Sequence, residues 1–118
     1  MCAGVALVAC NSLADEPIRA ESWSADVTAT RQVLFIAFTT NASAVTGSGN
    51  LSSLLSPGST DALTLAGTRR ADTLDVTLSR ATGDRFRFIG SYTANGAGLS
   101  GRLSGAEFAN TFVAFRRQ

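Results

Sequence analysis

Apolar and polar residues alternate along most of this chain from residue 23 onward, and Gly, Asn, Asp or Pro interrupts them about every 8–12 residues. Successive side chains of a strand point to opposite faces, so this alternation predicts strands with one buried face. No window shows the period of about 3.6 residues that would predict a helix. The pattern predicts about eight strands, at residues 23–29, 33–40, 45–51, 62–69, 73–79, 85–93, 98–104 and 111–117.

The turns between these strands have their own signals. Asn95-Gly96 is the strongest, because both residues tolerate the positive φ of a tight hairpin. Ser56-Pro57-Gly58-Ser59 is a second turn, with Pro fixing φ and Gly following it. Pairing around Asn95-Gly96 sets Tyr92 opposite Leu99, Gly90 opposite Gly101 and Phe88 opposite Leu103 on one face, with Ile89 opposite Arg102 on the other.

The apolar positions of the later strands share one face. That inward face holds Leu63, Leu65, Leu74, Val76, Leu78, Phe86, Phe88, Leu99, Leu103, Val113 and Phe115. Glycines within the strands allow a strongly coiled sheet. These features predict an all-β fold: an antiparallel up-and-down meander of about eight strands that forms a small closed or nearly closed barrel.

Two strands depart from the one-sided pattern. Residues 33–38, Val-Leu-Phe-Ile-Ala-Phe, are apolar on both faces, and residues 112–115 are so less strongly. One face of each strand belongs in the core. We expect the other set, Leu34, Ile36 and Phe38 together with Phe112, to face outward and form a partner-binding patch. The alternative is that the N-terminal segment folds over these side chains.

The N-terminal segment carries a different signal. Leu7-Val8-Ala9-Cys10 ends a short apolar run and resembles the lipobox of bacterial lipoproteins. The resemblance implies a signal-like segment at residues 1–9, a lipidated Cys10 with a polar tether through residue 22, and a barrel domain at residues 23–118. It also implies a membrane-anchored location on the extracytoplasmic, periplasmic side of the cell envelope. The alternative is an ordinary buried strand or helix start.

Composition excludes several function classes. The chain has no His, so it lacks a Ser-His-Asp triad, an imidazole metal ligand and a His general base. A net charge of +1 gives no basic field for nucleic acid. Asp72, Asp75 and Asp84 are the nearest approach to an acid–base set, and turn or surface roles explain them better. We therefore expect no enzyme activity, no cofactor and no metal.

Several segments resemble the small Gly/Ser/Thr-rich barrel lipoproteins of bacterial envelopes, with a lipocalin-like meander. They are residues 45–51, 65–68, 74–78 and 99–105. The likeness covers most of the barrel domain and implies its fold without its ligand. The function expected is a non-catalytic accessory or structural subunit that docks on a membrane protein complex, of which a respiratory or photosynthetic assembly is one example. The alternatives are a carrier of a small apolar ligand in the barrel and an inhibitor of a secreted hydrolase.

Overall fold

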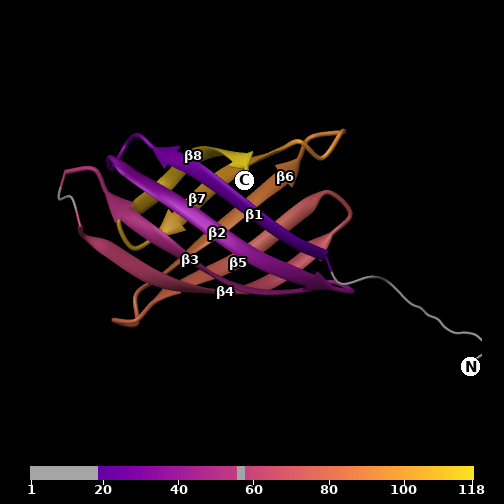
Figure 1. Ribbon diagram of the computed structural model, residues 1–118, viewed down its shortest axis with the longest axis horizontal. Coiled ribbons are helices and arrows are strands. Elements are labelled where there is room, and N and C mark those ends of the chain that lie inside the picture. The colour runs from indigo at the N-terminus through magenta and orange to yellow at the C-terminus, as the bar shows by residue number, and fades with distance from the viewer. Residues whose placement is uncertain (1–18, 56–57) are drawn as a thin grey trace, which may run out of the picture.

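The computed structural model describes residues 19–55 and 58–118 as one closed barrel of eight antiparallel strands, each paired with the next in sequence (Figure 1). The strands are β1 (Arg19–Val27), β2 (Gln32–Asn41), β3 (Ala44–Ser53), β4 (Thr60–Arg70), β5 (Thr73–Arg80), β6 (Arg85–Tyr92), β7 (Gly98–Gly105) and β8 (Phe108–Arg117). The prediction of an all-β up-and-down barrel is confirmed, and the described residues contain no helix.

The hairpin of β6 and β7 has the predicted register. Tyr92 pairs with Leu99, Phe88 with Leu103, and Ile89 with Arg102. The turn itself differs from the tight form expected, because only Gly96 has a positive φ, of 71°. The Asn95 side chain instead stabilises a wider loop by accepting a hydrogen bond from the backbone N–H of Ala97 at 3.0 Å.

The first strand begins at Arg19, earlier than the alternation predicted. Residues 19–22 pair with residues 37–40 of β2, so part of the expected tether belongs to the barrel wall. This extension brings a carboxylate, Glu21, to the inner side of the barrel end, where it is 9% exposed.

Large apolar side chains fill the barrel interior. Every residue of the predicted inward face is buried, including Phe88 at 1% and Leu103 at 0% exposure. The ring of Phe88 packs edge-on against Phe115, with centroids 5.2 Å apart. Glycines allow close packing of the barrel wall: a Cβ on Gly90 would overlap the Phe88 ring, and one on Gly101 would overlap the backbone carbonyl oxygen of Ile89. Large inward side chains and glycines within the strands thus fit together in a narrow barrel.

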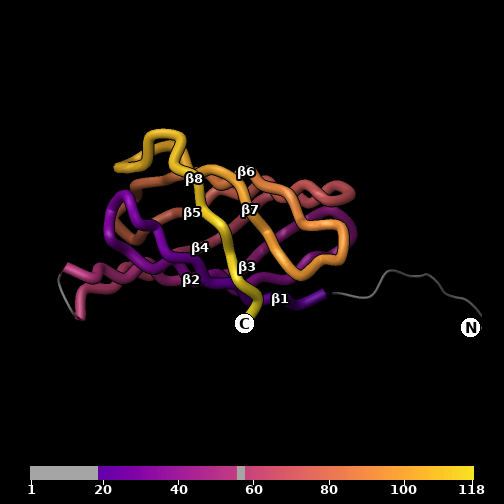
Figure 2. Tube along the Cα trace, turned by 90° about the horizontal axis from the view of Figure 1, so that it is seen from above, coloured from indigo at the N-terminus to yellow at the C-terminus, as the bar shows by residue number. Residues whose placement is uncertain are grey.

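The barrel closes where β8 meets β1. Only Trp23 with Arg117 and Ser24 with Arg116 pair across this seam. The backbone N–H of Gln118 adds a hydrogen bond to the carbonyl of Ser22 at 2.9 Å. Figure 2 shows the C-terminal end of β8 reaching β1. The pairing of β8 with β1 is therefore short compared with the pairings between the other neighbouring strands.

Candidate functional site

The structure corrects the expected partner-binding patch. Leu34, Ile36 and Phe38 are 0%, 1% and 3% exposed, so they belong to the core and the prediction of their outward orientation is wrong. Phe112 does face outward, with 59% of its surface exposed. Cys10, the predicted lipidation site, lies outside the described residues.

The orientation of β2 is decided by its partner β1. Residues directly opposite each other in an antiparallel pair point to the same face. Ile36 lies opposite Trp23, which is fully buried, and Leu34 lies opposite Ala25. The residues that alternate with them on β2, including Phe35, lie on the outer face and are half-buried. Period-two alternation could not choose between two apolar faces, and the pairing with the inward Trp23 that settles the choice is seen only in the folded barrel.

Two exposed apolar side chains lie on the outer face of β6, β7 and β8. Ile89 is 45% exposed and Phe112 is 59% exposed. Arg102 lies between them, because it pairs with Ile89 on one side and with Phe112 on the other. We call Ile89, Arg102 and Phe112 the outer row. Sequence reasoning found Phe112 and the pairing of Ile89 with Arg102 but did not join them, because the register of β8 was not known.

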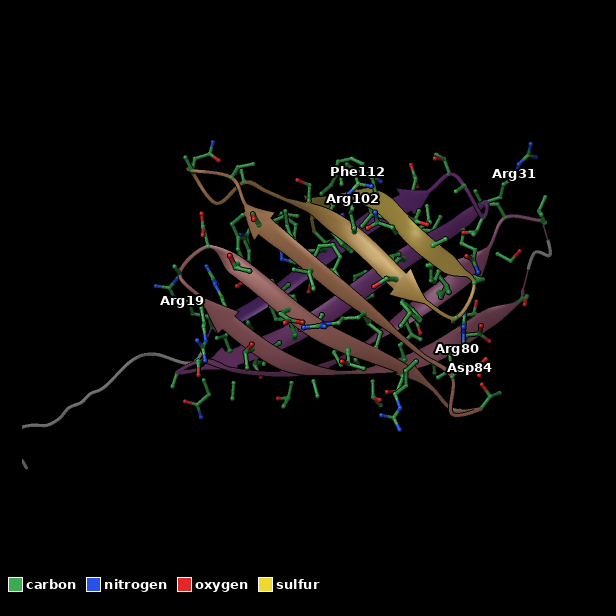
Figure 3. The ribbon with its side chains drawn as sticks, turned by 180° about the vertical axis from the view of Figure 1, so that it is seen from behind. Arg19, Arg31, Arg80, Asp84, Arg102 and Phe112 are labelled. Carbon is green, nitrogen blue, oxygen red and sulfur yellow. The ribbon has the colours of Figure 1, made fainter. Side chains whose placement is uncertain are left out.

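Arg102 is held in place beside Phe112 (Figure 3). Its Nη1 donates a hydrogen bond to the backbone carbonyl of Asn110 at 3.0 Å. Its Cζ lies 5.9 Å from the centre of the Phe112 ring, within cation–π distance. Asn110 has a positive φ of 56°, and it lies in an irregular stretch of the β7–β8 pairing. The carbonyl that holds Arg102 therefore comes from an irregular part of the strand pairing.

Charge is unevenly distributed around the barrel. The sequences of β6, β7 and β8 contain no Asp or Glu, whereas Arg85, Arg87, Arg102 and Arg116 project from their outer face. We call these four residues the arginine wall. On the far side of the barrel, β2 and β3 carry no charged residue at all. The outer row therefore lies within a basic surface.

A buried polar cluster lies at the barrel end from which β1 starts. Glu21 Oε1 accepts hydrogen bonds from Trp23 Nε1 and Tyr92 Oη, both at 2.9 Å. Its Oε2 accepts one from Arg69 Nη1 at 2.8 Å. The Arg69 guanidinium also stacks over the Tyr92 ring, 4.1 Å from its centroid. Burial and the bond to Glu21 raise the pKa of Tyr92. All three side chains donate to the Glu21 carboxylate, which fits a role in holding the barrel end together.

An ion-pair cluster lies at the opposite barrel end. Arg80 binds Glu107 through two hydrogen bonds of 2.8 and 2.6 Å and Asp61 through one of 3.1 Å. Its guanidinium lies 5.3 Å from the ring centre of Phe86 in the core. The bond to Glu107 raises the pKa of Arg80, and the same bond holds the pKa of Glu107 below its usual value. This cluster covers the apolar interior at that end.

The three aspartates weighed as an acid–base set are not brought together as one. Asp75 lies on the outer face of β5 and binds Arg87 through two hydrogen bonds of 2.8 and 2.6 Å, which lower its pKa. Asp72 and Asp84 lie in turns, where their carbonyls accept backbone hydrogen bonds from Tyr92 and Arg80. Over residues 19–55 and 58–118, no group of three or more His, Cys, Asp or Glu side chains is placed to hold a metal ion. Within the same residues, no helix has the length and apolarity needed to cross a membrane.

Comparisons with protein-family models, with curated proteins and with solved structures found no match to this chain.

Proposed function

We propose that this protein is a lipid-anchored, non-catalytic accessory subunit that docks on a membrane protein complex at the periplasmic side of the cell envelope. The observation that carries the proposal is the outer row, which exposes Ile89 and Phe112 around an ordered Arg102. Aromatic residues and Arg are the side chains that most often dominate protein–protein binding energy. The row thus replaces the patch that was expected on β2.

The outer row has enough apolar surface to contribute to binding. Full burial of a side chain such as Phe or Ile is worth about 1.5–3 kcal/mol. Both side chains are roughly half exposed, so a partner that covers them gains about half of that from each. Arg102, already restrained by Asn110, loses less conformational freedom on binding than a mobile side chain would.

The lipid anchor sets where docking occurs. An extended chain spans at most about 3.3–3.6 Å per residue, so the nine steps from Cys10 to Arg19 reach about 30 Å. A barrel tethered at Cys10 works close to the membrane surface and meets the extracytoplasmic parts of membrane proteins. Two or more acyl chains give stable anchoring where one is marginal.

The barrel interior favours docking over the carrier alternative. Trp23, Phe86 and Phe88, each at most 2% exposed, lie in a single packed core with the other inward side chains. A lipocalin-like carrier holds its ligand where these rings lie. The outer surface is therefore the better candidate for function.

Variants of the full chain in its native host test this function. Cys10→Ser should release the protein from membranes. Ile89→Ser combined with Phe112→Ser should leave the protein folded and anchored but lower its co-migration with a membrane complex about tenfold after mild detergent extraction. The matched control is Leu54→Ser with Leu55→Ser, which removes two apolar side chains that are more exposed than Ile89 and Phe112 from the β3–β4 connection.

Two results would refute the proposal. A mature peptide that spans Ala9 and unmodified Cys10 would exclude the anchor. Equal co-migration of the outer-row variant and the control variant would exclude docking through this surface.

A further inference from the structure

We infer that the surface docked against β6, β7 and β8 is an acidic, carboxylate-rich protein surface. This inference rests on the proposed docking function and adds the chemistry of the partner. Two features carry it: the arginine wall and its arrangement around the apolar outer row.

The arginine wall has unused positive charge. Arg87 is neutralised by Asp75, with 2.6 Å between Nη2 and Oδ2. Arg116 meets Asp26 only at 3.8 Å, and both side chains are more than half exposed, at 63% and 57%. Neither Arg85 nor Arg102 forms an ion pair within the described part of the chain. Three of the four guanidinium groups are therefore free, or nearly free, to bind an incoming acidic group.

The chemistry of these groups suits carboxylates. Arginine presents a planar fork of N–H donors that matches the two oxygens of a carboxylate. Arg102 keeps its remaining donors while Asn110 holds its Nη1, and it lies between two apolar side chains. An arginine at the centre of an exposed apolar row fits a protein interface, because Arg and aromatic residues are enriched among the side chains that anchor such interfaces.

The same features fit an anionic lipid surface less well. Recognition of anionic lipids commonly uses clusters of about 4–8 Lys or Arg next to the membrane anchor. Here the free arginines are spread over three strands of the barrel wall, and the strand that follows the tether, β1, carries Arg19 together with Glu21 and Asp26. Complementarity to an acidic protein surface accounts both for the spread of the free arginines over three strands and for the restraint of Arg102.

The test uses the full chain with Cys10→Ser, which carries no lipid, and two probes. One probe is a poly-L-glutamate peptide of about 20 residues, a length close to that of one side of a standard interface. The other is a vesicle of phosphatidylcholine with or without phosphatidylglycerol. Backbone amide signals from nuclear magnetic resonance report where each probe binds.

The glutamate peptide should shift amides of β6, β7 and β8 and leave β2 and β3 unchanged. Arg85→Ser with Arg102→Ser should weaken its binding about tenfold. The control Arg70→Ser, at an exposed arginine on β4, should change it less than about twofold.

Either of two results would overturn the inference. One is peptide shifts that centre on Arg19 and Arg70 or spread evenly over the barrel. The other is stronger binding to phosphatidylglycerol vesicles than to the peptide, which would make the wall a membrane surface. Because the assay needs neither lipid nor complex, its failure rejects the acidic partner alone, while anchoring and docking are judged by the extraction experiment.

Discussion

The guanidinium of Arg117, at the end of β8, lies over the indole ring of Trp23 in β1, with Cζ 4.4 Å from the ring centroid. The same side chain donates a hydrogen bond from Nη2 to the carbonyl oxygen of Gly96 at 2.8 Å. One residue thus connects the last strand, the first strand and the β6–β7 loop. It does so where the closing seam has only two paired positions.

Arg117→Ala should weaken barrel closure. It removes a cation–π contact and a charge-assisted hydrogen bond, and we expect a loss of about 1–2 kcal/mol in the free energy of unfolding. Urea denaturation followed by Trp23 fluorescence measures this loss. The neighbouring Arg116→Ala removes only a long, exposed ion pair and should cost less than about 0.5 kcal/mol. Equal effects of the two changes would show that the stacking on Trp23 has no special role.

Glu21→Ala should be among the most destabilising single changes. The side chain of Glu21 is 6% exposed, and its loss leaves the guanidinium of Arg69 and the donors of Trp23 and Tyr92 without their acceptor. Removing one partner of a buried ion pair costs about 3–5 kcal/mol.

The double change Glu21→Leu with Arg69→Met removes both charges and should recover much of that loss. Chemical denaturation of both variants shows whether the loss comes from leaving the Arg69 charge unpaired. A loss below about 1 kcal/mol for Glu21→Ala would mean that water replaces the carboxylate and that the cluster is not a structural tie.

Stability should fall in acid partly through Glu107. Its folded-state pKa lies below the ordinary 4.5 because Arg80 binds its carboxylate. A group with a lowered folded pKa contributes its full stability above the unfolded pKa and loses it as the pH falls through the folded value. The contribution of Glu107 should therefore be complete above about pH 5 and decline from about pH 4.5 downward.

Denaturation midpoints at pH 7, 5, 4 and 3 compare the natural chain with Glu107→Gln. The variant should be less stable at pH 7 and should lose less stability on acidification. Solvent screens this pair, since 37% of the Glu107 side chain is exposed, so the effect is expected to be small. Parallel pH profiles for the two proteins would exclude the contribution.

Phe38 and Phe112 should respond in opposite ways to truncation. Phe38 is 3% exposed, and Phe38→Ala should cost about 3–5 kcal/mol through the cavity it leaves. Phe112→Ala should change stability by less than about 1 kcal/mol, because the ring lies mostly in solvent. Thermal unfolding of the two variants tests the assignment of faces directly, and a severe loss for Phe112→Ala would remove it from the candidate surface.

The sequence by itself determined the fold class, most of the core and the hairpin of β6 and β7. These depend on local rules: period-two alternation, turn residues and pairing outward from a turn. Phe88 and Leu103 could be matched because only one hairpin separates them. The lipobox-like tetrapeptide is local too, so the proposed anchor at Cys10 required no fold.

Only the tertiary structure decided which face of β2 is inside and which residues form the outer row and the barrel-end clusters. Both faces of β2 are apolar, so its orientation depends on pairing with Trp23 in β1. Tyr92 and Glu21 are 71 positions apart and meet only after the barrel closes. Ile89, Arg102 and Phe112 align only when the register of three strands is set. Such contacts depend on closure and register across several strands, and no local pattern in the chain encodes either.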